Sequence, residues 1–403
     1  MLETELLLIL IIGAAFLYDF VNGFHDAANA IATIVATRVL TPLQAVTMSA
    51  IGNFTGMVFG TLVGVLIAKT ISKGIIDTHL TAGWAGVYLI LAVLIGAIGW
   101  DLITWWLGLP TSSSHALVGG LVGGGLAMAG TAAILGPKPE YVFRFLAFVV
   151  IGILAGALAW GAVEAASKNG KLARGLLYGS MGGGVIAAGV AGWYYQKQLL
   201  GLTVTVIFMV VSPLIGMGVA YLITSVTMHA LRKRKAKVVN WYFRKLQLVS
   251  SFFYSVMHGT SDAQKVMGII TIVLVFDGTL TSFEVPLWVV VGCHAAISLG
   301  TFFGGWRIVK TMASRITALH PYQGFCAETG GGLVLLMNAA FGIPVSTTHV
   351  ISSSIMGVGA TKRMSAVRWG VARTVIWAWI LTIPMSGLLA FCAFSAMRMA
   401  GLV

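Results

Sequence analysis

The chain has 403 residues, of which 58% are hydrophobic and only 9% are charged, and it contains 50 glycines. Its mean hydropathy of +0.94 is typical of a polytopic membrane protein and excludes an ordinary soluble domain. The formal net charge of +13 does not indicate nucleic-acid binding, because the basic residues are scattered through short segments between apolar stretches. The expected surroundings are therefore a lipid bilayer, with no nucleic-acid partner.

The first apolar run, from Leu6 to Val39, contains an unusually polar stretch. Charged and amide side chains at membrane depth are expensive, so they normally face a protein-lined cavity and mark a substrate or ion pathway. Gly23 in the same stretch predicts a break in the helix, because discontinuous membrane helices free backbone groups for ligands. The polar residues concerned are Asp19, Asn22, His25, Asp26 and Asn29.

Two motifs recur later in the chain. The stretch around Asp26 aligns without gaps with Met257-His-Gly-Thr-Ser-Asp-Ala-Gln-Lys, in which Asp262 follows Asp26 by 236 residues. The segment Leu109-Pro-Thr-Ser-Ser-Ser-His115 recurs as Ile343-Pro-Val-Ser-Thr-Thr-His349, at an offset of 234 residues. Two motifs in the same order at nearly the same spacing indicate an internal duplication.

In both copies of the second motif a proline precedes hydroxyl residues, which is a helix-start signal. Helix N-termini bind anions, because unpaired backbone amides and the positive end of the helix dipole point at the ligand. The alternative is that the hydroxyls only cap helices or pack between them. The residues concerned are Thr111, Ser112, Ser113 and Ser114 after Pro110, and Ser346, Thr347 and Thr348 after Pro344.

Asp26 and Asp262 cannot attract an anion unaided, since like charges repel strongly at low dielectric constant. A bound cation is the simplest remedy, and inward-moving cations would also offset the cost of about 2.3 kcal/mol per charge per 100 mV for moving an anion into a cell that is negative inside. Carboxylate and amide oxygens suit Na⁺ or a proton. We expect no cofactor beyond this coupling cation and no structural metal. The alternative is structural, with an aspartate paired to Lys265 or capping a half-helix.

The four motifs resemble those of the PiT inorganic phosphate transporters, whose two halves each carry a Gly-x-Asn-Asp-like signature followed by a Pro-x-Ser-x-Thr-His-like one. The motif Asn22-Gly-Phe-His-Asp-Ala-Ala-Asn29 is most similar to that of the bacterial low-affinity branch of this family. The resemblance covers nearly the whole chain and implies a transporter, not an enzyme. Many members have Asn where His25 and Ser261 stand and Glu where Asn53 falls, which leaves the coupling ion open.

Motifs and resemblance together give the expected site. The predicted phosphate-binding residues are Thr111, Ser112, Ser113, Ser114, Ser346, Thr347, Thr348, Lys265, Asn29 and Gln264. The predicted coupling-cation residues are Asp26, Asp262, Asn22, His25, Glu328 and Ser261. Glu328 is included because Gly324-Phe-Cys-Ala-Glu-Thr-Gly330 resembles a family position linked to ion binding; an ordinary interhelical hydrogen bond is the equal alternative. Lys265 stands at the position of Asn29 and would replace one cation.

The positive-inside rule places the basic segment 230–245 in the cytoplasm and both termini outside. Full spans are predicted at about 6–38, 43–68, 142–164, 175–195, 199–229, 246–276, 284–306 and 368–396. The stretches 84–133 and 325–360 are predicted as re-entrant hairpins around Pro110 and Pro344. The expected fold is an all-α polytopic membrane protein with an inverted-topology repeat and discontinuous helices. Its parts are repeat one (1–165), connecting helices with the basic loop (166–245) and repeat two (246–403).

The predicted function is import of inorganic phosphate across the cell (inner) membrane by cation-coupled symport and alternating access. Protons are favoured over Na⁺, because His25 beside Asp26 changes charge between pH 5 and 8, and transport as a metal–phosphate complex is left open, as is a homo-oligomer. The runner-up is a permease of the same fold for sulfate or another oxyanion. An anion channel is less favoured, as is an intramembrane hydrolase, whose nucleophile and base would not recur symmetrically.

Overall fold

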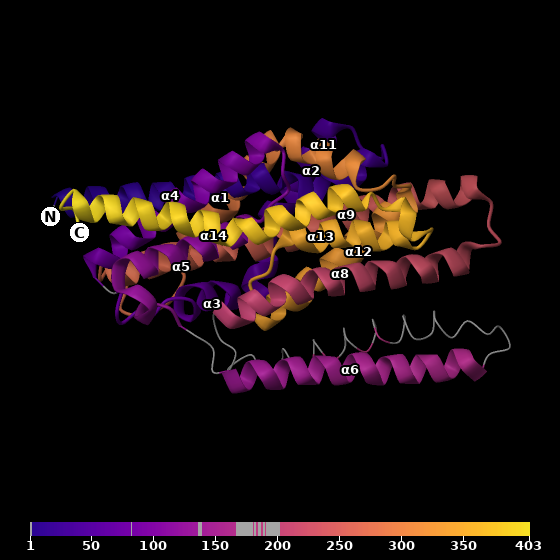
Figure 1. Cartoon of the computed structure of the whole chain (residues 1–403). Coiled ribbons are helices and arrows are strands. Elements are labelled where there is room, and N and C mark those ends of the chain that lie inside the picture. Colours follow the sequence, from indigo (N-terminus) through magenta and orange to yellow (C-terminus); the bar gives the residue numbers. More distant parts are fainter. Residues whose placement is uncertain are drawn as a thin grey trace.

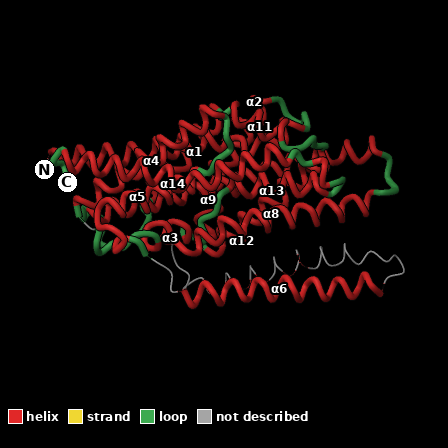
Figure 2. Tube along the Cα trace, in the orientation of Figure 1, coloured by secondary structure: helices red, strands yellow, loops and turns green. Residues whose placement is uncertain are grey.

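The computed structural model describes residues 2–81, 83–135, 139–166 and 202–403, with isolated positions between 180 and 190. Regular structure in these ranges is helical (Figure 2), apart from one isolated bridge between Ile76 and Ile134. The long helices lie side by side in an elongated bundle, and both chain termini lie at the same end of it (Figure 1). The α-helices are α1 (Leu2–Ala36), α2 (Pro42–Val63), α3 (Leu66–Gly74), α4 (Trp84–Leu107), α5 (Ser113–Ala129), α6 (Pro139–Ala166), α8 (Leu202–Leu231), α9 (Ala236–Phe276), α10 (Leu287–Phe303), α11 (Trp306–Arg315), α12 (Pro321–Phe341), α13 (Thr347–Ala360) and α14 (Trp369–Met399).

The bundle has the composition of a multi-pass membrane protein. In the described ranges, 8 helices are long and apolar enough to cross a bilayer, and the bent pair Leu287–Phe303 and Trp306–Ala313, with 69° between its two helices, makes up to 9. Large apolar side chains are exposed along α2, α6, α8 and α14, as expected for surfaces that face lipid tails instead of water. The polar and charged residues of the motifs are instead buried inside the bundle.

The stretches predicted as hairpins form helix pairs, but α4, α5 and α12 are each long and apolar enough to cross a bilayer, so their re-entrant course stays a prediction. α4 packs against α5 and α12 against α13, and each pair is joined by a short irregular segment, 108–112 or 342–346. α13 has 14 residues, about 21 Å of helix, which is too short to cross a hydrocarbon core of about 30 Å. Spans predicted at 142–164, 199–229 and 368–396 coincide with α6, α8 and α14. The span predicted at 175–195 lies outside the described residues.

The prediction of a helix break at Gly23 is wrong. α1 runs unbroken through Gly23, and α9 runs unbroken through its counterpart Gly259. The reason is packing: a Cβ atom on Gly23 would lie 2.1 Å from the carbonyl oxygen of Ile297 in α10, and one on Gly259 would lie 2.4 Å from that of Asn53 in α2. Both glycines therefore permit a close helix crossing, as small residues do in membrane bundles.

Three predicted boundaries also need correction. The span predicted at 43–68 ends at Gly64, whose φ of 94° favours glycine, and the chain continues as α3. The span predicted at 284–306 ends at Phe303, where Gly304 also has a positive φ of 67°, and turns into α11. The basic segment 230–245 is not a loop throughout, because only 232–235 separate α8 from α9: residues 230–231 end α8 and residues 236–245 form the first turns of α9.

The packing of the two halves is reciprocal. α1 packs against α10 and α11, while α9 packs against α2 and α3. The pair α4 and α5 packs against α14, while the pair α12 and α13 packs against α8. The partners given for α1, α9 and the α4–α5 pair come from the other copy of the duplicated sequence, whereas α8 belongs to the connecting segment. The centre of the bundle is therefore built from both copies.

The close crossings give a test of the fold. We expect Gly23→Ala to lower the thermal unfolding temperature in detergent, because the added methyl group overpacks the α1–α10 contact at a cost of about 3 kcal/mol. Gly13→Ala on the same helix, where nothing lies within 4 Å of the added Cβ, is the matched control. It should leave the unfolding temperature unchanged or raise it, since alanine favours helix. Equal unfolding temperatures for the two variants would contradict this account of Gly23.

Candidate functional site

Asp26 lies in α1 and contacts both hydroxyl motifs. Its Oδ1 atom lies 2.7 Å from Nδ1 of His25 and accepts a long hydrogen bond of 3.5 Å from Ser113. Its Oδ2 atom accepts hydrogen bonds of 3.2 and 3.4 Å from the hydroxyls of Thr348 and Thr347. All five side chains are buried. Asp26 thus joins the hydroxyl motif of its own half to that of the other half.

Asp262 occupies the equivalent place in α9 and is paired with Lys265. Nζ of Lys265 lies 2.5 Å from Oδ1 of Asp262, and it also donates to the carbonyl of Val345 at 2.9 Å and to the hydroxyl of Ser114. The other carboxylate oxygen of Asp262 accepts a hydrogen bond of 3.1 Å from Thr347. The ion pair weighed as the structural alternative is therefore present, and Lys265 neutralises only one of the two aspartates.

A third group, His258, completes a possible cation site. Ligand atoms of Asp26, His258 and Asp262 all lie within 4.8 Å of one another. The Nδ1 atom of His258 lies 3.1 Å from the side-chain oxygen of Asn53, whose amide nitrogen donates to Thr301 at 2.7 Å. That contact makes Nδ1 the donor, so in a neutral ring the bare Nε2 faces Oδ2 of Asp262 at 3.3 Å. Two acceptors at this distance need a proton or a metal cation between them.

His25 connects Asp26 to the break between α4 and α5. Its Nε2 atom lies 3.1 Å from the hydroxyl of Thr104 and 3.3 Å from that of Thr111. Thr111 in turn donates to Thr104 at 2.8 Å. Thr111, expected as a phosphate ligand, is therefore engaged in a continuous chain of hydrogen-bonding groups that ends at the Asp26 carboxylate.

The hydroxyl motifs begin helices as predicted. Ser112 and Ser346 are the N-caps of α5 and α13, and their side-chain oxygens accept the amides of His115 at 3.2 Å and His349 at 3.1 Å. The capping alternative thus holds for these two serines, although each keeps its hydroxyl hydrogen for another acceptor. The rings of His115 and His349 meet edge to face with centroids 4.3 Å apart, so the starts of the two helices face each other inside the bundle.

Two tyrosines outside the predicted set fix the backbone at both breaks. The Tyr18 hydroxyl donates to the carbonyl of Ser113 at 2.7 Å, and the Tyr254 hydroxyl donates to the carbonyl of Thr347 at 3.0 Å. Tyr254 follows Tyr18 by 236 residues, the offset that also separates the two motif aspartates. The duplication alone could therefore have identified this pair of tyrosines in the sequence. It also aligns His258 with Asn22.

Three further predicted residues lie on the same helices. Asn29 donates to the hydroxyls of Thr347 at 3.2 Å and Thr348 at 2.9 Å. Its side-chain oxygen, that of Asn22 and the hydroxyl of Ser261 are buried without a hydrogen-bond partner within the described ranges. Buried acceptors and donors left in this way are costly unless a ligand, ion or water completes them.

Gln264, predicted to bind phosphate, lies apart from the cluster. Its side-chain oxygen accepts the amide of Ile67 at 3.2 Å, and its amide group donates to the carbonyl of Gly64 at 3.3 Å. Both bonds hold the turn between α2 and α3. Gln264 therefore stabilises the break at Gly64 and has no hydrogen bond to the aspartates or to the hydroxyl motifs.

Glu328 of α12 forms a second polar cluster. It accepts hydrogen bonds from Thr33 at 2.5 Å, from Gln247 at 3.1 Å and from Ser250. Thr33 follows Asp26 by 7 residues on α1, which corresponds to about 10 Å along the helix axis. These contacts are interhelical hydrogen bonds, the alternative role expected for Glu328 from the sequence. The residue lies outside the cluster that holds the paired aspartates.

A buried, partly unsatisfied polar cluster inside an apolar helical bundle is typical of a multi-pass membrane protein with a substrate or ion pathway, such as a transporter. A family model described as the phosphate transporter family matches residues 22–175 and 227–390. The chain belongs to the phosphate transporter family, which confirms the resemblance in the motifs, and it is not an enzyme.

Individual relatives agree over nearly full length. A protein of Rhizobium meliloti named probable low-affinity inorganic phosphate transporter is 42% identical over 97% of this chain and 96% of its own. A Bacillus subtilis protein of the same name is 35% identical over 98% of both chains. A solved structure titled the sodium-dependent phosphate transporter matches with a TM-score of 0.69 over 98% of this chain and 99% of its own. At 23% identity, that match supports the fold alone.

The paired tyrosines give a test of the site. Tyr18→Phe and Tyr254→Phe should each lower stability by about 1 kcal/mol, because each removes one buried hydrogen bond to a carbonyl at a break. Each should also weaken phosphate uptake, measured as a higher KM in proteoliposomes. Tyr88→Phe in α4, whose hydroxyl makes no hydrogen bond within the described ranges, is the control and should change neither quantity. A loss of the same size in all three variants would speak against a role at the breaks.

Proposed function

We propose that this protein imports inorganic phosphate across the cytoplasmic membrane by cation-coupled symport. The observation that carries the proposal is the approach of Asp26 and Asp262 to within 4.8 Å beside hydroxyl donors from both motifs. Phosphate at neutral pH carries a P–OH group that can donate to a carboxylate, whereas sulfate does not, and polar sites strongly reject such a mismatch. The names of the relatives from Rhizobium meliloti and Bacillus subtilis support the same substrate.

An inverted-topology repeat provides the route for alternating access. The reciprocal packing of α1 on α10 and of α9 on α2 supports a pseudo-two-fold relation between the halves. In such folds the substrate site lies near the bilayer midplane at the repeat interface, where the two hydroxyl motifs meet here. We infer that both hairpins are re-entrant and that the basic end of the bundle is cytoplasmic, which places both termini outside.

We favour protons over Na⁺ as the coupling ion. Each aspartate has a histidine neighbour, at 2.7 Å for His25 with Asp26 and at 3.3 Å for His258 with Asp262. Histidine is the side chain whose charge ordinarily changes between pH 5 and 8. Lys265 stands where the first copy of the motif has Asn29, so one neutral oxygen ligand that Na⁺ would use is replaced by a fixed cation.

One observation supports a second form of the transported substrate, a metal–phosphate complex. Asp26, His258 and Asp262 offer two carboxylate oxygens and one imidazole nitrogen within 4.8 Å, a donor set that suits divalent transition metals better than Na⁺. In that case the metal would travel with phosphate as substrate and would replace the coupling proton at this point of the site.

The role of the two aspartates is tested by substitutions that remove the negative charge and keep the shape of the side chain. Asp26→Asn and Asp262→Asn should each abolish concentrative phosphate uptake into proteoliposomes, because the cation loses its charge partner, while the protein remains folded. Glu5→Gln, which removes a carboxylate on an exposed stretch of α1, should leave uptake unchanged, and excess sulfate should not compete. Accumulation of phosphate by both aspartate variants would make the carboxylates structural.

The coupling ion is tested separately. With Na⁺ replaced by choline, we expect an inward proton gradient to drive uptake, and His25→Asn to reduce that proton response severalfold. Uptake is measured with radiolabelled phosphate at fixed external pH, with and without a protonophore. Strict dependence on Na⁺, no response to the proton gradient and a silent His25→Asn variant would together reverse the assignment.

A further inference from the structure

A cavity lies far from the paired aspartates, at the other end of the bundle from the chain termini (Figure 1). Its volume is about 650 Å³, within the range of roughly 300–1,000 Å³ that is typical of small-molecule sites. It lies between the α8–α9 turn and the ends of α12 and α13. No residue of the central cluster lines it, so the transport site does not account for it.

The cavity is lined by basic residues without acidic counterparts. Arg232, Arg234 and Lys237 come from the α8–α9 turn and the start of α9, while His320 precedes α12 and Lys362 follows α13. No Asp or Glu is among the lining residues, and none of these basic side chains has a carboxylate partner within the described ranges. The cavity therefore concentrates uncompensated positive charge.

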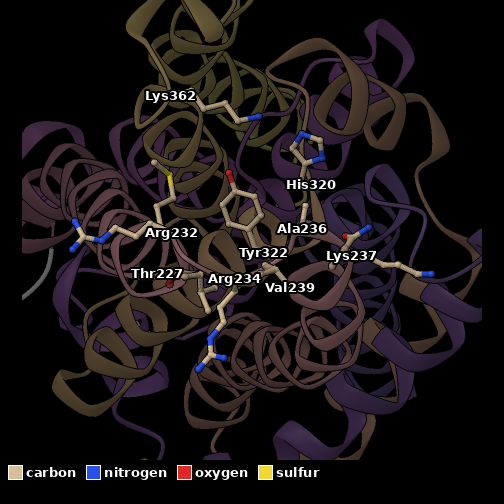
Figure 3. A pocket seen from close by; sticks show the side chains of 12 residues that line it. Thr227, Arg232, Arg234, Ala236, Lys237, Val239, His320, Tyr322 and Lys362 are labelled. Atoms are coloured by element: carbon tan, nitrogen blue, oxygen red, sulfur yellow. The ribbon is translucent and has the colours of Figure 1, made fainter.

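Membrane topology alone does not explain this arrangement. The positive-inside rule requires basic residues near one membrane face, but it does not require that they surround a cavity. Figure 3 shows Tyr322 in the middle and Lys362 extending from one side toward His320. The charged ends of Arg232, Arg234 and Lys237 point outward, away from Tyr322 (Figure 3). These three side chains are long and exposed, so they can turn inward toward a bound anion.

The rest of the lining defines the ligand more closely. Met228, Leu231 and Val239 supply an apolar wall, and Tyr322 adds an aromatic ring. A single phosphate ion would fill little of this volume and would use none of the apolar surface. The complementary ligand has several negative charges at one end and an apolar portion at the other.

We propose that this cavity binds an anion that joins two or more phosphate groups to an apolar portion, and that its binding slows transport. Two sources share this chemistry: a nucleoside triphosphate from the cytoplasm and a phospholipid with two phosphodiester groups, such as cardiolipin. The effect on transport rests on the proposed function. The ligand would bridge the α8–α9 turn to Lys362 and His320 at the ends of the α12–α13 hairpin, which carries Thr347 and Thr348, and would restrain that hairpin.

Binding is measured first, because it does not depend on transport. The full chain is placed in phosphatidylcholine nanodiscs and titrated with radiolabelled ATP; retention of cardiolipin is measured in parallel by native mass spectrometry. We expect saturable binding of one of the two, weakened at least tenfold by Arg234→Ala combined with Lys362→Ala. The matched control is Lys233→Ala with Arg363→Ala, which removes the same charge from neighbouring positions that do not line the cavity, and it should bind within twofold of the unaltered protein.

The titration of His320 gives a second readout. Burial and the nearby charge of Lys362 hold the pKa of His320 below its usual range, so a bound polyanion should raise that pKa in an NMR titration. Phosphate uptake by unaltered proteoliposomes should fall severalfold with ligand present, and the Arg234/Lys362 double variant should resist this inhibition while keeping its uptake without ligand.

The outcomes separate the two sources and the two proposals. Saturable binding of ATP alone assigns a soluble ligand, and retention of cardiolipin alone assigns a lipid. Absence of both, or an equal loss in the control double variant, would overturn the site and leave these charges with a topological role only. If binding is found but the protein carries no phosphate, the proposed function fails while the site stands.

Discussion

The structure depends on holding two carboxylates close together inside an apolar bundle. Two unit charges about 5 Å apart repel by roughly 3 kcal/mol at an effective dielectric constant of about 20. Asp26 and Asp262 are surrounded by Lys265, two histidines and the hydroxyls of Thr347 and Thr348. Each of these surrounding groups offsets part of the repulsion between the two carboxylates. Lys265 is the only fixed positive charge among these groups, so the charge of one carboxylate is left for the coupling cation that we propose.

The duplication explains how such a cluster is assembled. Asp26 of the first half accepts its hydrogen bond from Thr348 of the second, and Lys265 of the second half donates to Ser114 of the first. Tyr18 and Tyr254 then fix the two breaks in the same way, each from the long helix of its own half. The two halves therefore contribute equivalent parts that become a site only where they meet.

Much of this arrangement was predictable from the sequence, because buried polarity and repetition are both visible in it. The hairpins around Pro110 and Pro344, the helix starts at Ser112 and Ser346 and the two central aspartates follow from local residue types. The break predicted at Gly23 is absent. A glycine can mark either a helix break or a close helix crossing, and only the position of Ile297 in α10 decides between the two. The role of Gln264 in phosphate binding stays a prediction, and its hydrogen bonds to Gly64 and Ile67 come from a turn that no local pattern placed beside it.

The reciprocal packing has a consequence for how the chain is made. α1 leaves the ribosome early, but α10, against which Gly23 packs, is synthesised more than 200 residues later. Until then Asp26 and Asn29 lack their partners Thr347 and Thr348, and a helix with this polarity is costly to hold alone in lipid. The first half must therefore wait at the insertion machinery or keep its polar face toward water or another helix. A chain that ends before α9 would leave Asp26 and Asn29 in the bilayer without the hydroxyls of Thr347 and Thr348.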